Sequence, residues 1–457
     1  MRLRRATRGG DAVAFGSRIA AAPMSPTPAH TADAESPAFL RAVVELARRR
    51  PVITARAIYD HAGVKLIDAA VPVDASLYDR LAAKRITHRL DECVVTDAPV
   101  SAAMLREAAA AALERLPFFA AMAPDAAARD TLLQAVAAIP LPGPVAFQLT
   151  LVRETTTAQF DHSVLMALLC VHLARDAGAS GDELTAAASA GLLHDLGMLH
   201  IDPKLLQPGH RLSGPERRPL YVHPLASALL VDRFDVYPKQ VSRAIVEHHE
   251  QLDGSGYPRG LAGNTISRLG RVLSLAEVVT AMFDGHRKHP EQRVSLMLRL
   301  SPRRFEPAGI AAVQRLLATL PAPVDEPGMA IAASVQRLQL LAGLLTDWHD
   351  ALDRTSPQLD EASQAVLRSV AEQAETLQRM LADAGITADQ LGMLTLDAEN
   401  DPSLRVELWA LAQELQWHLL ASANQLQRRW ESIGAPEPYP EVFAAWLDTF
   451  RALEPAG

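Results

Sequence analysis

The stretch HHEQLDGSGYP, residues 248–258, carries the strongest local signal in this sequence. It follows the apolar segment AIVE, residues 244–247, whose pattern predicts a helix leading into a glycine-rich loop. Neighbouring residues on a helix point about 100° apart, so His248 and His249 converge on one ion only with difficulty. They can readily serve two ions a few ångströms apart. The stretch therefore favours a pair of metal ions over a single one.

Histidine is concentrated around this stretch. The chain holds 15 histidines, and eight of them lie at His162, His172, His194, His200, His210, His223, His248 and His249. A lone histidine on an apolar face is usually a core residue. Histidines on several successive helices, with Asp195 next to His194, are harder to explain by packing. Apolar surroundings disfavour a charged imidazole, whereas a divalent metal stabilises the neutral ring.

The ligand types indicate a class of chemistry. Asp195 has two carboxylate oxygens and can bridge two ions. Nitrogen and oxygen ligands without a thiolate suit iron, manganese, nickel or zinc in a catalytic setting. Two metals roughly 3.5–4 Å apart can activate water and neutralise phosphate oxygens. These residues therefore predict a two-metal site for phosphoryl chemistry.

Short motifs around these residues occur in a recognisable order: HS at 162–163, HDLG at 194–197, HP at 223–224, HHE at 248–250 and DGSGYP at 253–258. Together they resemble the HD-GYP family, the helical subgroup of HD phosphohydrolases whose members typically act as cyclic di-GMP phosphodiesterases. The resemblance covers about residues 145–320. Its HHE and GYP signature is very specific, whereas a bare His-Asp pair would be a weak signal.

The resemblance implies a set of site residues and cofactors. The implied metal ligands are His162, His194, Asp195, His223, His248, His249 and Glu277, with His194 and Asp195 as the catalytic pair. Substrate contacts are implied for Gly256, Tyr257 and Arg287, although packing explains Tyr257 equally well. The cofactors would be two divalent transition-metal ions, with iron or manganese favoured over nickel or zinc. Members with a third metal carry a glutamate where this chain has Ala158, which favours two ions.

The sequence also departs from the family pattern. Met198 stands where a phosphate-facing lysine is usual, and Glu277 replaces the last metal-binding aspartate. Thr280 replaces the second aspartate of that pattern, and HRKH at 286–289 replaces Arg-Pro-Tyr-Arg. Glutamate remains a legitimate ligand, but its extra methylene can shift the metal geometry. These changes predict a slow enzyme or a domain that has lost catalysis.

Composition bounds the remaining possibilities. The chain has 457 residues, 49% apolar and 21% charged, which fits two or three folded domains and excludes wholesale disorder. The net charge of −8 argues against broad binding to nucleic acid or an anionic membrane. Two cysteines, Cys93 and Cys170, exclude a disulfide framework. No apolar run approaches the ~18–20 residues that cross a bilayer, so we expect a cytoplasmic protein.

The pattern along the chain predicts a mostly α protein in four parts. Residues 1–35 read as a disordered tail, in which Arg18 interrupts any signal-peptide core. Residues 36–140 predict a small α/β module with a hairpin over 52–72, and the proline-rich step at 140–144 marks its end. Residues 141–320 would form the HD-GYP helical domain. Residues 328–457 predict a C-terminal helical bundle that packs on this domain or on a second copy as a homodimer.

The leading functional hypothesis is hydrolysis of cyclic di-GMP to pGpG or GMP through a metal-bridging hydroxide. The main alternative is a degenerate HD-GYP domain that binds metal or nucleotide and acts as a signalling adaptor. Met198 and Glu277 favour the adaptor, whereas the complete ligand set from His162 to His249 favours the enzyme. Hydrolysis of another phosphoester is a third hypothesis.

Overall fold

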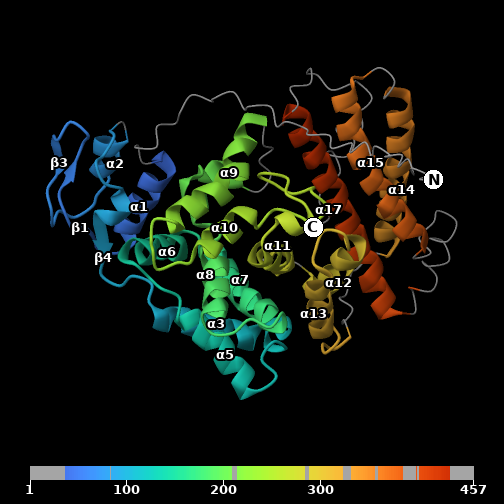
Figure 1. Ribbon diagram of the computed structural model, residues 1–457, viewed down its shortest axis with the longest axis horizontal. Helices are drawn as coiled ribbons and strands as arrows, with labels where there is room; N and C mark the ends of the chain where they lie inside the picture. The colour runs from blue at the N-terminus through green and yellow to red at the C-terminus, as the bar shows by residue number, and fades with distance from the viewer. Residues whose placement is uncertain are drawn as a thin grey trace, which may run out of the picture.

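A computed structural model (Figure 1) describes residues 36–82, 84–207, 214–283, 288–322, 331–355, 359–383, 398 and 401–432. Within them the chain is mostly helical, with two short antiparallel strand pairs. The predicted fold class is therefore confirmed. Figure 1 shows the strands with α1 and α2 at one end, a central group of helices, and a bundle of long helices at the other end.

The strand-containing part begins with a capped helix. Its elements are α1 (Pro37–Arg49), β1 (Val52–Thr54), β2 (Ile58–Tyr59), β3 (Lys65–Ile67), α2 (Ser76–Leu81), η1 (Leu90–Glu92) and β4 (Val94–Thr96). The Ser36 hydroxyl accepts a hydrogen bond from the Phe39 amide at 3.1 Å, which satisfies one of the free donors that start a helix.

The predicted hairpin over 52–72 is present, with regular pairing only near its turn. Strand β2 pairs with β3 across a turn in which Asp60 Oδ1 accepts from the amides of Ala62 and Val64, at 3.0 and 2.9 Å. Strand β1 bridges Pro72 through Ile53, at the far end of the predicted hairpin, and also pairs with β4, with Val52 opposite Thr96. Three-residue strands provide little pairing energy alone, so these pairs depend on the helices behind them.

The central helices follow. In chain order they are α3 (Ala102–Arg115), α4 (Pro117–Ala120), α5 (Ala126–Ala137), α6 (Gly143–Thr155), α7 (Thr157–Asp176), α8 (Asp182–Leu193), η2 (Leu196–His200), η3 (Pro203–Leu206), α9 (Gly214–Val231), α10 (Lys239–Glu247), η4 (Gly263–Thr265), α11 (Arg268–Ala281), α12 (Pro290–Leu300) and α13 (Pro307–Leu317). Helices α7 and α8 are packed along much of their length. A Cβ on Gly191 would lie 2.8 Å from the backbone of Ala167, so glycine permits this close approach.

One apolar core runs through both of these parts. It extends from Phe39 of α1 to Leu316 of α13 and crosses the proline-rich step at 140–144 without a break. That step lies just before and within the first turn of α6, and the Tyr237 hydroxyl donates to the Pro140 carbonyl. The strand-containing part is thus fused to the central helices by a shared core.

The long C-terminal helices form a second core. They are α14 (Ile331–Thr355), α15 (Glu361–Asp383) and α17 (Pro402–Ser432), and their apolar faces pack together with Leu296 and Leu300 of α12. A buried ion pair between Arg293 and Glu414 also joins α12 to α17. Figure 1 shows α17 as the bundle helix that lies toward α9 and α11.

Some sequence-based expectations lie outside the described residues, namely the tail at 1–35, the predicted substrate contact Arg287, and the part of the predicted C-terminal bundle beyond residue 432. Among the helices that the structure describes, none is both long and apolar enough to span a bilayer. The cytoplasmic location, the homodimer and the domain limits stay predictions.

Candidate metal centre and adjoining cavity

Seven predicted ligands come from five helices and the turns that end two of them. His162 lies on α7, His223 on α9 and Glu277 on α11. His194 is the residue that ends α8 and is followed by Asp195, and His248 ends α10 and is followed by His249. Because these helices pack around one another, residues that are up to 115 positions apart meet in one place.

Three of the histidines have the same backbone contact. Each Nδ1 atom lies within hydrogen-bond distance of the carbonyl oxygen three residues earlier, in the pairs His194–Gly191 at 2.8 Å, His223–Leu220 and His248–Ile245 at 2.6 Å. A carbonyl only accepts, so Nδ1 carries the proton of each neutral ring. The Nε2 atom is then left with a lone pair, which is the form that binds a metal.

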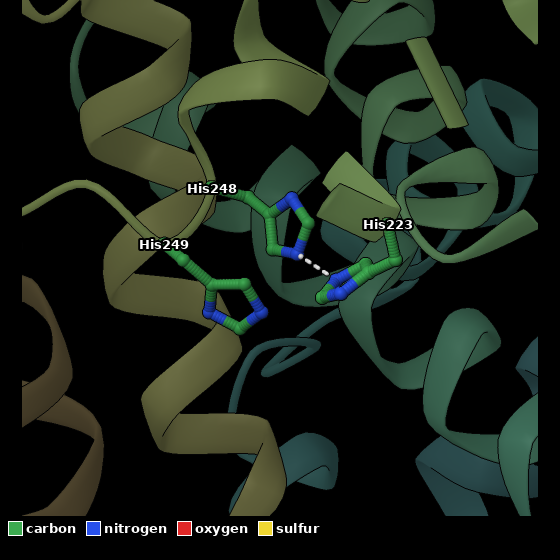
Figure 2. Close-up of side chains that lie close together, drawn as sticks. All are labelled: His223, His248 and His249. Atoms are coloured by element: carbon green, nitrogen blue, oxygen red, sulfur yellow. Dashed lines mark hydrogen bonds between the residues drawn. The ribbon is translucent and has the colours of Figure 1, made fainter. Parts of the chain in front are cut away.

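The ligand atoms form two groups. In one group, Glu277 Oε2 lies 3.2 Å from His162 Nε2 and 3.3 Å from His194 Nε2. In the other group, His223, His248 and His249 face one another (Figure 2), with the Nε2 atoms of the first two 3.2 Å apart. Within each group, one ligand atom from every residue lies within 4.8 Å of the others. Each group has the size and donor types of a metal site.

Asp195 lies between the two groups. Its Oδ1 atom is 3.0 Å from His223 Nε2 and 3.8 Å from His248 Nε2, in the second group. Its Oδ2 atom is 3.5 Å from His194 Nε2, in the first group. One carboxylate therefore presents a different oxygen to each group, which is the arrangement of a bridging ligand.

Two buried polar atoms of the site lack good hydrogen bonds, which shows whether these residues suit a metal. His194 Nε2 and Asp195 Oδ1 are buried and lack a well-aligned hydrogen bond, although Oδ1 has His223 nearby at 3.0 Å. Leaving such a group unsatisfied costs about 1–3 kcal/mol. A divalent cation held by these imidazole nitrogens and carboxylate oxygens would satisfy both atoms, so the residues present fit a metal.

Electrostatics keep the carboxylates of the site ionised. Burial disfavours the charge on Asp195, but His194 and His223 outweigh it and hold the pKa of Asp195 below its usual range. Burial opposes the charge on Glu277 in the same way, and His162 and His194 lower the pKa of that carboxyl. Ionised carboxylates are the form that a metal requires.

The surroundings shift the pKa values of the histidines in the second group in opposite directions. Burial lowers the pKa of His249 to about 3, and burial with the neighbouring rings lowers the pKa of His248 well below its usual value. Burial also disfavours the charge on His223, but Asp195 reverses the balance and raises the pKa of that ring. Asp195 is therefore the main partner of His223 while no cation lies between them.

Two glycines let the ligand-bearing segments approach. A Cβ on Gly197 would lie 2.6 Å from the carbonyl oxygen of His223. A Cβ on Gly256 would lie 2.4 Å from the carbonyl oxygen of His249. The buried carboxylate of Glu250 accepts from the amides of Arg259 and Leu261, at 2.7 and 2.8 Å, and holds the end of the same loop. Gly256 thus has a packing role beside the substrate contact that the sequence predicts.

A cavity of about 340 Å³ adjoins the metal ligands. His249 and Glu277 form part of its wall, and the ring of Tyr257 stacks on His249 with 4.6 Å between centroids. Tyr257 therefore both packs on a ligand and lines the cavity. Met198 is half-buried in η2 and is not among the lining residues, and Arg287 lies outside the described residues.

Much of the cavity wall was not foreseen from the sequence. Helix α17 contributes Trp417, Leu420, Ala421, Asn424 and Arg428, α9 adds Tyr221, and the turn between α12 and α13 adds Arg304. The helical pattern predicts α17 itself, but no local motif marks these side chains. Their only sequence signal is an arginine pair, Arg428 and Arg429, on an otherwise amphipathic segment.

Fold and site together define a helical domain built around converging histidine and carboxylate ligands. Residues 148–308 match the family described as "HD domain". A 3'3'-cGAMP-specific phosphodiesterase 1 of Vibrio cholerae is 36% identical over 124 residues, which are 27% of this chain and 28% of the relative. Cyclic di-GMP phosphodiesterase PA4108 of Pseudomonas aeruginosa is 37% identical over 166 residues, which are 35% of this chain and 38% of the relative.

The chain thus spans less than two fifths of the length of these curated relatives. Among solved structures, the HDG"Y"P protein Bd1817 from Bdellovibrio bacteriovorus shows a TM-score of 0.34 and 15% identity, covering 58% of this chain and 95% of that one. That likeness is too loose to bear on function. Residues 148–308 therefore match the HD-domain family, and the resemblance to HD-GYP proteins that the sequence indicated is confirmed for this segment.

Proposed function

We propose that this protein is a metal-dependent phosphodiesterase that hydrolyses a cyclic dinucleotide, with cyclic di-GMP as the leading substrate and pGpG or GMP as product. The observation that carries the proposal is Asp195, whose two oxygens face separate groups of metal-ligating side chains next to a cavity. Relatives with matching segments are named as cyclic di-GMP and 3'3'-cGAMP phosphodiesterases, which supports this substrate class.

The ligand residues would hold two divalent ions, which supply Lewis acidity and an activated water when bound. His162, His194 and Glu277 would hold one ion, and His223, His248 and His249 the other. Asp195 fixes the spacing between the two groups, and the carbonyl contacts of the histidines fix which nitrogen faces the centre.

The protein side chains also prepare the site for an anion. Asp195 and Glu277 carry fewer charges than two divalent ions, so the loaded centre is net positive although the chain carries −8. The Tyr257 ring and the apolar side chains of Ala281 and Met282 line the adjoining cavity. An anionic phosphodiester is therefore attracted locally, and the low dielectric strengthens that attraction.

A second candidate function is nucleotide binding without catalysis. The hydroxyl of Thr280, which stands where the family has an aspartate, is buried and has no hydrogen-bond partner in the structure. Helix α17 also covers part of the cavity. Both observations favour a remodelled site that binds and signals through the C-terminal helices.

One experiment separates the two functions. The full chain would be purified without oxygen, reconstituted with Mn²⁺ or Fe²⁺, analysed for metal content, and assayed with cyclic di-GMP and 3'3'-cGAMP. Hydrolysis that Asp195→Ala abolishes supports the phosphodiesterase. Tight nucleotide binding to metal-loaded protein, with no hydrolysis, overturns it in favour of the adaptor. Protein that binds no metal under these conditions contradicts the phosphodiesterase.

A further inference from the structure

We propose that Arg428 of α17, together with Arg304, forms the phosphate-binding part of the cavity beside the metal centre, so that the C-terminal bundle completes the substrate site. This inference rests on the proposed function and names residues for its substrate. The ligand class is a cyclic dinucleotide, which has one phosphate for the metals and a second for the arginines.

The position of Arg428 is fixed from two sides. Its Nη2 atom donates to the Ser255 carbonyl at 3.2 Å, next to the GYP loop. Its guanidinium lies over the rings of Tyr221 and Tyr257, at 5.1 and 5.3 Å from their centroids. These contacts leave the guanidinium half-buried, oriented and facing the cavity.

A guanidinium has five N–H donors in a rigid plane. The Ser255 carbonyl takes one of those of Arg428, and the two tyrosine rings lie 5.1 and 5.3 Å from its central carbon. The other N–H groups can serve a phosphate, which arginine binds with paired hydrogen bonds.

The charge balance of the cavity also indicates an anionic ligand. Among its described lining residues, Glu277 is the one carboxylate, and that side chain belongs to the metal ligands. Arg304 lines the same wall, with Asp253 at 4.0 Å as an ion-pair partner. Burial lowers the pKa of Arg304, the charge of Asp253 opposes this shift, and repulsion from Arg428 adds a smaller lowering effect. Two cations held together in a partly buried wall are stabilised when an anion binds.

The rest of the wall suits nucleobases. Trp417 offers an aromatic surface on which a base can stack, and Gln251 and Asn424 offer amides for base edges. The metal ligands His249 and Glu277 border the same space. Met198 does not line this cavity, whereas Arg428 places a cation on its wall from another part of the chain.

The test compares arginine variants of one helix. Arg428→Ala and Arg428→Gln remove the charge at the cavity. Arg405→Ala removes an equal charge from the far end of α17, where that side chain donates to the Ala398 carbonyl. All variants would be examined for KM and kcat with cyclic di-GMP and with bis(p-nitrophenyl) phosphate, a diester with one phosphate and no base. Equilibrium binding of cyclic di-GMP to metal-free protein gives a second measurement, and thermal melting monitors folding.

We expect both Arg428 variants to raise KM and Kd for cyclic di-GMP about tenfold to a hundredfold, since a charge-assisted hydrogen bond contributes about 1.5–3 kcal/mol. The loss on the small diester should be at least about ten times smaller, and Arg405→Ala should resemble wild type. Arg428→Lys should recover part of the affinity. Equal losses on both substrates, or unchanged KM and Kd in Arg428→Gln, would overturn the proposal.

The outcome also separates this inference from the proposed function. If wild type hydrolyses neither diester, but cyclic di-GMP binds and Arg428→Gln weakens that binding, the phosphodiesterase fails and the phosphate site stands. If wild type hydrolyses the small diester yet binds no cyclic dinucleotide, hydrolysis stands and the phosphate site is refuted.

Discussion

The Nε2 atoms of His223 and His248 lie 3.2 Å apart, while each ring directs its Nδ1 atom to a backbone carbonyl of its own helix. With both Nδ1 atoms protonated, two neutral rings would point lone pairs at each other. This pairing is unfavourable unless a proton or a cation lies between the nitrogens. The pKa of His223 is raised and that of His248 is lowered. When no metal is bound, a proton on His223 Nε2 therefore removes the repulsion between the two nitrogen lone pairs.

Metal should therefore stabilise the fold. We expect the protein to bind close to two transition-metal ions per chain, and we expect chelation to lower its Tm. A ligand present at a thousand times its Kd adds about 4 kcal/mol to the free energy of unfolding. Elemental analysis and thermal melting before and after chelator, with Mn²⁺ added back, measure both effects. A metal-free protein after anaerobic reconstitution would contradict this prediction.

Asp195→Ala should remove metal from both groups, because one carboxylate contacts His194 on one side and His223 on the other. We expect the metal content to fall below one ion per chain and hydrolysis to fall more than about a hundredfold, since even outer-shell changes cost up to that amount. Exposed Asp235, changed to Ala, is the matched control. Full metal content in Asp195→Ala would refute the bridging role.

Tyr257→Ala should separate binding from metal retention. Its ring stacks on His249 at 4.6 Å and lines the cavity, but it is not a metal ligand. Loss of a base-stacking surface costs about 1–3 kcal/mol, so KM for cyclic di-GMP should rise about fivefold to a hundredfold with metal retained. Tyr257→Phe should stay close to wild type in the same assays. Metal loss in Tyr257→Ala would instead assign the ring to packing.

Acid should destabilise the fold partly through His172. Its ring is half-buried, its Nδ1 atom has no hydrogen-bond partner in the structure, and burial lowers its pKa to about 4. The unfolded ring, with a pKa near 6.5, binds a proton first as the pH falls. The contribution of His172 to the free energy of unfolding is therefore lost as the pH falls from about 6.5 to about 4.

Replacing this ring tests that sign. The Tm of His172→Leu should depend less on pH between 6.5 and 4.5 than the Tm of wild type, with both proteins free of metal. Exposed His88, changed to Leu in the same way, is the control. An unchanged pH dependence in His172→Leu would show that other groups govern acid unfolding.

The departures from the family pattern predict the direction of two rate changes. A lysine at position 198 would present a cation to phosphate, a contact of roughly 1.5–3 kcal/mol. Met198→Lys should therefore raise the hydrolysis rate, by on the order of tenfold to a hundredfold. Glu277→Asp should change the rate only modestly, because a small shift of α11 can restore the contacts of 3.2 and 3.3 Å to His162 and His194.

Steady-state rates and melting curves of the two variants provide the measurement. Met198 is half-buried in η2 and does not line the cavity. A lower rate together with a lower Tm in Met198→Lys would mean that the position serves packing rather than phosphate.

The sequence predicted what depends on local pattern. Helical periodicity identified the fold class and the long segments that become α14, α15 and α17, and the order of short motifs identified the family. The hairpin over 52–72 was predicted and its ends do meet, with Ile53 bridging Pro72, but the additional pairing of β1 with β4, 40 residues away from Thr54 to Val94, was not predicted. Alternation along a strand does not identify its partner.

Contacts between distant helices could not be predicted in this way. An amphipathic pattern shows that α17 buries one face, but it does not show that Trp417 and Arg428 border a cavity beside His249. Nor does it show that the core continues from Phe39 to Leu316 across a proline-rich step. Both features depend on how the helices pack against one another, and the pattern of a single sequence does not predict that packing.

The carbonyl contacts of the three histidines use acceptors that their helices leave vacant. Gly191 and Ile245 lie in the last turns of α8 and α10, where carbonyls have no further amide to pair with. The carbonyl of Leu220 lies in mid-helix, but its usual donor would be the nitrogen of Pro224, which has no hydrogen. The proline of the His-Pro motif thus frees an acceptor for His223. Backbone positions that would otherwise need water instead set the tautomer of the metal ligands.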